Sequence, residues 1–163
     1  MKFEHLVEIN DLTNPLIEVI TRVQLWRGLV MRVESPKTFM PYMDQCTITP
    51  IDTLSMSRVL HFGEFVVEDQ VTLTPMECVR CDIKAQGDIA PSCLRMQIEE
   101  PTPEHLFVRF TYDMQENSAD NADAAESNMV EKYRQSAYAE ADIDTIRIIR
   151  ELAESGRLDV QPS

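Results

Sequence analysis

The chain has 163 residues, of which 44% are hydrophobic and 7% aromatic, and it contains only four glycines. This composition predicts a single globular domain, residues 1–163, that is large enough to bury a core. The formal net charge of −13 argues against nucleic acid and anionic membrane surfaces as partners, because like charges repel. No segment approaches the roughly 20 apolar residues of a membrane span, and the acidic N-terminus is unlike a targeting peptide. We therefore expect a cytoplasmic protein without integral membrane association.

The first expected element is a half-buried strand, because one alternating set of residues is mainly apolar: Phe3, His5, Val7 and Ile9. A turn at Asn14-Pro15 follows. Two short helices are expected next: Thr21 is a candidate N-cap for the first, which Pro36 ends, and the second covers about 37–42.

Six further strands are predicted from alternating patterns between Gly, Pro and Asp turn residues. They cover 46–49, 56–62, 65–74, 78–85, 92–99 and 106–114. The short connections favour an antiparallel meander, because parallel strands need long crossovers.

A polar, acidic loop is expected at about 115–128, with Asp123 and Glu126 spaced as a capping pair. A helix is predicted from about Asp123 to Ser155, ended by Gly156, with a short tail at 157–163. Its apolar stripe is expected to contain Val130, Tyr133, Ala137, Tyr138, Ala141, Thr145, Ile148, Ile149 and Leu152. Ile143 and Ile146 fall beside the stripe, where they could contact another element or a second subunit.

This order of elements predicts an α+β fold in which a seven-stranded curved antiparallel sheet wraps around the long C-terminal helix. Such a sheet can leave a pocket beneath the helix. The inward alternation predicts its apolar walls: Leu94, Met96, Val108, Phe110, Tyr138 and Thr145.

A few polar side chains share these inward faces: His5, Arg58, Asp69 and Tyr112, with Tyr138 on the helix. A two-residue turn at Gly63-Glu64 would place Arg58 opposite Asp69. Two interpretations are open for this pair: a buried ion pair that fixes the register, or an inward anchor for a ligand. His5 could equally bond a core carbonyl, and the two tyrosines could be ordinary core aromatics.

Cys78 and Cys81 have C-x-x-C spacing, but residues three apart on a strand point to opposite faces. We therefore expect reduced cysteines, no disulfide, no metal and no cofactor. Motifs of phosphate-binding, dinucleotide-binding, zinc-peptidase and serine-hydrolase sites are absent.

Several motifs resemble the AtaL-like family within the START, birch-pollen-allergen and polyketide-cyclase (SRPBCC) superfamily. They are Phe3-Glu4-His5, Leu25-Trp26-Arg27-Gly28-Leu29, Leu60-His61-Phe62-Gly63, Val71-Thr72-Leu73, Ile98-Glu99-Glu100-Pro101, Ser136-Ala137-Tyr138 and Ala141-Asp142-Ile143-Asp144-Thr145. The resemblance covers almost the whole chain. It implies the helix-grip (START-like) fold and binding of lipids, polyketides, sterols or similar molecules, but not one reaction.

The leading functional prediction is a protein that binds or sequesters a small, largely hydrophobic ligand that is lipid-, polyketide- or aromatic-like. The residues predicted to contact it are His5, Trp26, Arg58, Asp69, Met96, Phe110, Tyr112, Tyr138 and Thr145. The alternative is a cyclase or dehydratase of secondary metabolism, with His5 or Asp69 as base, Arg58 polarising a carbonyl, and Tyr112 or Tyr138 donating a proton. A third possibility is an interaction module, such as a weak homodimer, that uses Ile143 and Ile146.

Overall fold

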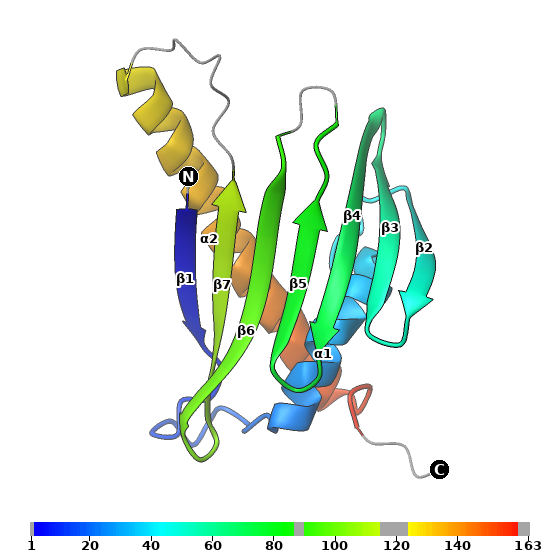
Figure 1. Cartoon of the computed structure of the whole chain (residues 1–163). Helices are drawn as coiled ribbons and strands as arrows, with labels where there is room; N and C mark the ends of the chain where they lie inside the picture. The colour runs from blue at the N-terminus through cyan, green and yellow to red at the C-terminus, as the bar shows by residue number, and fades with distance from the viewer. Residues whose placement is uncertain (1, 87–89, 115–123, 160–163) are drawn as a thin grey trace.

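The computed structural model describes residues 2–86, 90–114 and 124–159, without the side chains of 124–128, 130 and 131. Its elements are, in chain order, β1 (Lys2–Glu8), α1 (Arg22–Glu34), the 3-10 helix η1 (Pro36–Thr38), β2 (Gln45–Asp52), β3 (Ser55–Phe62), β4 (Phe65–Thr74), β5 (Cys78–Ile83), β6 (Ser92–Thr102), β7 (His105–Met114) and α2 (Ala124–Glu154). The seven strands form one antiparallel sheet in the order β1-β7-β6-β5-β4-β3-β2 (Figure 1). The predicted meander is confirmed, and β1 pairs with β7 to form one edge of the sheet.

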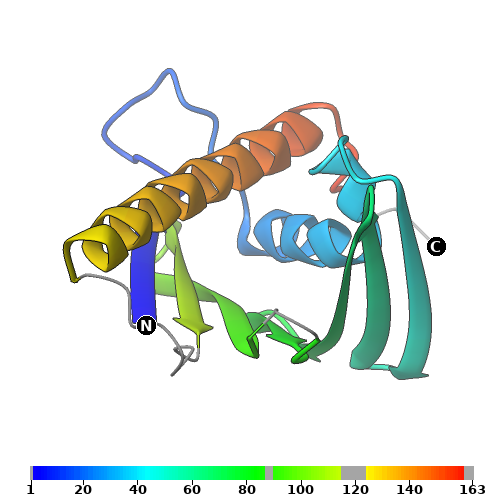
Figure 2. The ribbon, with the colours of Figure 1, turned by 90° about the horizontal axis from the view of Figure 1, so that it is seen from above.

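The sheet curves, and both helices lie on its concave side (Figure 2). Helix α1 lies within the concavity, whereas α2 passes over β1 and then over α1. The two helices cross where α1 has a glycine: a Cβ at Gly28 would lie 2.6 Å from Cγ2 of Ile149. Only the lack of a side chain at this position allows so close an approach.

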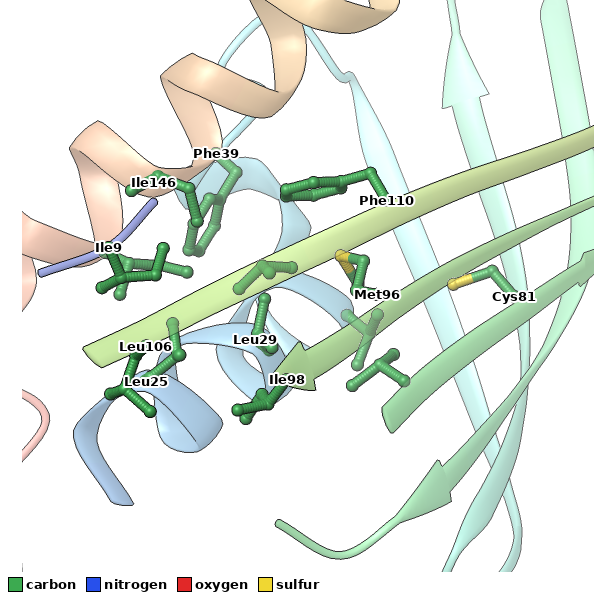
Figure 3. Close-up of a cluster of buried hydrophobic side chains, with 14 of the residues drawn as sticks. Ile9, Leu25, Leu29, Phe39, Cys81, Met96, Ile98, Leu106, Phe110 and Ile146 are labelled. Carbon is green, nitrogen blue, oxygen red and sulfur yellow. The ribbon is translucent and has the colours of Figure 1, made fainter. Parts of the chain in front are cut away.

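The core lies between these helices and the inner face of the sheet (Figure 3). Its fully buried members from the sheet include Val79, Met96, Val108 and Phe110, and α1 adds Leu25, Leu29 and Val33, all at 0% exposure. The sequence predicted a sheet wrapped around the long C-terminal helix, which implies that this helix alone covers the concave face. That expectation is wrong, because α1 presents one residue per turn to the sheet and fills the middle of the concavity.

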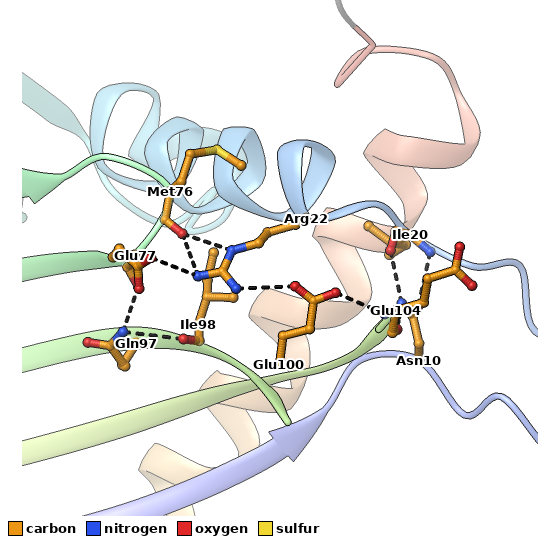
Figure 4. Close-up of polar contacts among 9 residues, drawn as sticks. All are labelled: Asn10, Ile20, Arg22, Met76, Glu77, Gln97, Ile98, Glu100 and Glu104. Atoms are coloured by element: carbon orange, nitrogen blue, oxygen red, sulfur yellow. Dashed lines mark hydrogen bonds and ion pairs between the residues drawn. The ribbon is translucent and has the colours of Figure 1, made fainter. Parts of the chain in front are cut away.

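The start of α1 is held to two turns of the sheet by a polar network (Figure 4). Arg22 donates to the carbonyl oxygen of Met76 at 2.9 and 3.1 Å and to Glu100 at 3.2 Å. The buried Asn10 amide donates to the carbonyls of Ile20 and Glu104 at 2.9 and 2.7 Å. Met76 and Glu104 have positive φ, of 64° and 69°, and these bonds hold both turns in that conformation.

Several local predictions are confirmed. Thr21 caps α1 in a capping box with Gln24. Gly63 has a φ of 63° in the two-residue turn that pairs Phe62 with Phe65, and Gly156 has a φ of 79° after α2. Both glycines occupy a conformation that favours glycine.

Other predictions need correction. The second short helix is only η1, because Pro36 starts it and no continuous apolar face extends it. Strand β6 continues to Thr102, with a register shift after Glu99, where we expected a turn. The segment 124–128 is helical rather than part of the acidic loop. The rest of the predicted loop, 115–123, lies outside the described residues, and so does Asp123 of the expected capping pair. The tail from residue 160 also lies outside them.

The predicted stripe of α2 is wrong at several positions. Tyr133 is 79% exposed, and Ala137 and Ala141 are exposed as well. The buried side of α2 instead contains Asp142, Thr145, Ile146, Ile149 and Leu152, with Tyr138 half-buried. Ile146, at 7% exposure, therefore belongs to the core and cannot form an outer surface with Ile143, which is 55% exposed.

Candidate functional site

Asp142 of α2 is the centre of a polar cluster beneath that helix. Its side chain is fully buried, and its two carboxylate oxygens have different partners. Oδ1 accepts a hydrogen bond from the hydroxyl of Tyr112 on β7, and Oδ2 lies 3.2 Å from Nδ1 of His5 on β1. The cluster therefore joins α2 to the two strands at one edge of the sheet.

Aromatic rings surround this cluster. The rings of Tyr112 and Tyr138 stack with centroids 4.1 Å apart and an angle of 8° between their planes. Phe3 lies against both, with centroid distances of 6.0 and 6.4 Å. Since Tyr138 is half-buried, the stacked pair presents an aromatic surface next to the polar groups.

The buried cluster has altered protonation equilibria. Burial raises the pKa of Asp142 from 3.8 to about 6, although hydrogen bonds with Tyr112 and His5 act in the opposite direction. Burial, followed by the neighbouring Asp142 charge, raises the pKa of Tyr112 above its ordinary value. Tyr112 is therefore a neutral phenol that donates to Asp142, and Asp142 can change protonation near neutral pH.

Arg32, in the last turn of α1, approaches the cluster from the other helix. Its Nε donates to Oγ1 of Thr145 at 3.2 Å, and the Thr145 hydroxyl donates to the carbonyl of Ala141 at 2.9 Å. Burial raises the pKa of Asp142 and of Tyr112, and the positive charge of Arg32 offsets a small part of that rise. The bond to Thr145 thus places the guanidinium between the two helices.

The cluster borders the less covered end of the concave face. Along β7, exposure rises from 0% at Phe110 to 8% at Tyr112. On the next two strands, the inner face changes from buried Met96 and Cys81 to half-buried Leu94 and Ile83. Leu94 is paired with Tyr112 in the register, so apolar surface continues directly from the cluster.

Arg58 and Asp69 form the predicted ion pair at another place on the inner face. They are opposite each other in the register and are 4% and 3% exposed. Nε and Nη2 of Arg58 donate to the two carboxylate oxygens at 2.9 and 2.5 Å, and Nη1 donates to the carbonyl of Val33 at 3.0 Å. Each nitrogen of the guanidinium therefore has a protein acceptor, which favours the structural interpretation of this pair.

The predicted site residues divide into three groups. His5, Tyr112, Tyr138 and Thr145 come together around Asp142 and Arg32. Arg58 and Asp69 bond to each other, while Met96 and Phe110 lie at 0% exposure in the core and Trp26 packs half-buried against it. His5 bonds a carboxylate rather than the backbone carbonyl that we considered.

The structure contains a pocket in a different place from the predicted one. A hollow of about 290 Å³ lies between the end of α1 and strands β2–β4. It is lined by Glu34, Ile48, Pro50, Asp52, Thr53, Ser55, Met56 and Leu73, none of which is among the six predicted wall residues. Of those six, Met96, Val108, Phe110 and Thr145 are buried, and only Leu94 and Tyr138 remain half-buried at the cluster.

Sequence reasoning missed Asp142 and Arg32 as site residues. From Tyr138, a helical stripe can continue at either Ala141 or Asp142, and hydrophobicity favours the alanine. Arg32 at the end of a helix is typical of a surface cation that complements the helix dipole. A signal for Asp142 was nevertheless present, because the steps 138, 142, 145 and 149 keep strict helical spacing.

The cysteines give no metal site within the described residues. Cys81 is buried on the inner face of β5, and Cys78 lies on the other face, as predicted. No group of three or more His, Cys, Asp or Glu side chains in the described ranges could hold a metal ion. The same ranges contain no helix with the length and apolarity needed to cross a membrane.

Comparison with known families gives one sequence match. The model of the AtaL family, described as acetylaranotin biosynthesis cluster protein L, matches residues 7–156. No curated protein sequence matches significantly.

Solved structures share the fold at low sequence identity. The di-domain aromatase/cyclase StfQ from the steffimycin biosynthetic pathway has a TM-score of 0.71 at 8% identity, over 96% of this chain and 52% of StfQ. Zhui aromatase/cyclase from Streptomyces sp. R1128 has a TM-score of 0.64 at 13% identity, over 94% and 93% of the two chains. Ara h 8.0201 has a TM-score of 0.61 at 10% identity, over 95% and 98%. The chain thus spans about half of the di-domain protein, and these likenesses show the helix-grip fold.

Proposed function

The chain belongs to the family of acetylaranotin biosynthesis cluster protein L, and we propose that it binds a small, largely apolar ligand on the concave face of its sheet. The ligand lies against the Tyr112–Tyr138 stack and Leu94, with the polar cluster at one end. Fold neighbours that include aromatase/cyclases support a ligand of polyketide or aromatic type. The four free cysteines support a reducing, cytoplasmic location.

The observation that carries this proposal is the polar cluster itself. A buried carboxylate costs free energy unless it is well bonded. Here the Asp142 carboxylate is hydrogen-bonded to Tyr112 and His5. The side chains of Leu94, Tyr138 and His5 in the same region are half-buried. A few placed polar groups beside a partly exposed apolar surface on a concave face are the usual composition of a small-molecule site.

The alternative function is a cyclase or dehydratase, and the bond between His5 and Asp142 favours it. His5 is 25% exposed, and its Nε2 has no hydrogen-bond partner among the described residues, whereas Nδ1 is held by Asp142. A carboxylate that orients one nitrogen of an imidazole leaves the other available as a general base. In that function His5 removes a proton from the substrate, and Asp142 is a positioning residue, because both of its oxygens are already bonded. The earlier assignment of Asp69 as base is less suitable, since Arg58 occupies its carboxylate.

A probe-binding experiment tests the proposed site. Leu94→Trp fills the apolar surface beside Tyr112, whereas Leu6→Trp adds the same ring on the outer face of β1, where Leu6 is 45% exposed. We expect a fluorescent hydrophobic probe to bind the wild type and Leu6→Trp equally and Leu94→Trp at least about tenfold more weakly. Equal binding to both variants would overturn the placement of the site.

Native mass spectrometry of the protein purified from its source tests the ligand directly. We expect a bound small molecule that is released on unfolding. Incubation with that molecule then separates the two functions, since a binder returns it unchanged and an enzyme converts it. An enzyme also loses turnover in His5→Gln while keeping its fold.

A further inference from the structure

Arg32 is held inside the molecule by a single side-chain bond. Thr145 has already donated its proton to the carbonyl of Ala141, so its oxygen accepts from Nε of Arg32 at 3.2 Å. Its side chain extends from the last turn of α1 to Thr145 on α2 and is half-buried there. The guanidinium therefore lies at the contact between α1 and α2.

This cation has no ion-pair partner within the described residues. The carboxylate oxygens of nearby Asp142 bond to Tyr112 and His5, and no described carboxylate lies within 4.0 Å of the Arg32 guanidinium. Its two Nη groups have no hydrogen-bond acceptor among the described residues, although the side chain is only partly accessible.

Comparison with the other arginines shows how unusual this is. Arg58 shares the inner face but has Asp69 and a backbone carbonyl as acceptors. The arginines without a hydrogen-bonded or ion-paired oxygen acceptor on another described element are all exposed, so water hydrates them: Arg80, Arg95, Arg134, Arg147 and Arg157. Arg32 differs because its side chain is half-buried, yet its unpaired Nη groups are not fully enclosed, so an anion at the surface of the site could bond them.

We propose that Arg32 binds an acidic group of the ligand, so that the ligand class is apolar carboxylic acids and similarly acidic enols or phenols. The fork of two Nη groups is suited to two oxygens of a planar anion. The Thr145 bond orients the fork, and the Tyr112–Tyr138 stack and Leu94 supply the apolar contacts. This inference rests on the proposed function and adds the charge of the ligand to it.

Isothermal titration calorimetry at pH 7.5 with matched probe pairs tests this proposal. The pairs are naphthalene-1-acetate with naphthalene-1-acetamide, and dodecanoate with dodecanol. We expect the wild type to bind each acid about tenfold or more tightly than its neutral partner, as a charge-assisted hydrogen bond implies. Arg32→Gln should lose this preference while still binding the neutral probes, and Arg32→Lys should keep part of it. Arg157→Gln, which removes an exposed charge outside the site, should keep all of it.

The possible results separate the two proposals. Equal affinity of the wild type for acid and neutral probe overturns the role of Arg32 but leaves the proposed function intact, and this result needs no variant to fold. An acid preference that survives in Arg32→Gln also overturns it. Failure of all four probes to bind overturns the proposed function, and the inference with it.

Discussion

Replacing Arg58 by methionine is expected to destabilise the protein strongly. Methionine matches the aliphatic part of the arginine side chain but removes the donors that bond Asp69 and the carbonyl of Val33. Asp69 is 3% exposed, so water cannot replace them without opening the sheet. Its carboxylate must then take up a proton or remain as an unpaired buried charge.

The magnitude follows from the geometry of the pair. Loss of one partner of a buried ion pair costs about 3–5 kcal/mol. The unpaired Val33 carbonyl contributes about 1 kcal/mol of that range. The double variant Arg58→Met/Asp69→Leu leaves no charge at this site, and we expect its free energy of unfolding to lie within about 1–2 kcal/mol of the wild type.

The assay is urea unfolding at pH 7, followed by circular dichroism and by the fluorescence of Trp26. Arg80→Met is the matched control, because Arg80 pairs with Asp82 on the outer face with both side chains 44% exposed. Loss of the Arg80–Asp82 ion pair should lower the free energy of unfolding by less than about 1 kcal/mol. If Arg58→Met loses no more stability than Arg80→Met, the structural interpretation is wrong. A stable Arg58→Met that no longer binds ligand would instead assign the pair to the binding site.

Three further predictions concern packing, pH and thiols. Gly28→Ala should destabilise by about 1–2 kcal/mol, because its Cβ would lie 2.6 Å from the stiff Ile149, and Ile149→Ala in the same chain should reduce that loss in a double-mutant cycle. The pKa of Asp142 is raised to about 6 from 3.8, so the native state binds this proton more tightly than the unfolded state. The free energy of unfolding of the wild type, relative to that of Asp142→Asn, should therefore fall by up to about 3 kcal/mol from pH 4 to pH 7. A difference between the two proteins that does not change with pH would contradict this. Burial raises the pKa of Cys81 to about 11, so thiol titration at pH 8 should leave this one unreacted until urea is added, and elemental analysis should find no stoichiometric zinc.

The sheet was largely predictable because alternation and turn chemistry are local signals. The two-residue turn at Gly63-Glu64 determines the register of β3 and β4, and that register is enough to place Arg58 opposite Asp69. Inward alternation likewise identifies Tyr112. These inferences need only the backbone geometry of neighbouring strands.

The candidate site was only partly predictable because it depends on contacts between distant elements. Asp142 is tolerable in the core only because Tyr112 and His5 arrive from two strands. Arg32 joins the cluster only through Thr145 on α2, a residue 113 positions away in the chain. A hydrophobicity pattern contains no information on such contacts between distant elements. From that pattern, an aspartate or a helix-terminal arginine is predicted to be a surface residue.

A chemical-shift map can locate a ligand that binds on the concave face beside the polar cluster. Isotope-labelled protein titrated with naphthalene-1-acetate should show its largest amide and side-chain shifts at Arg32, Leu94, Tyr112, Tyr138 and Thr145. Shifts confined to the hollow that Glu34, Met56 and Leu73 line, or no shifts at saturating probe, would mean that no ligand binds beside the polar cluster.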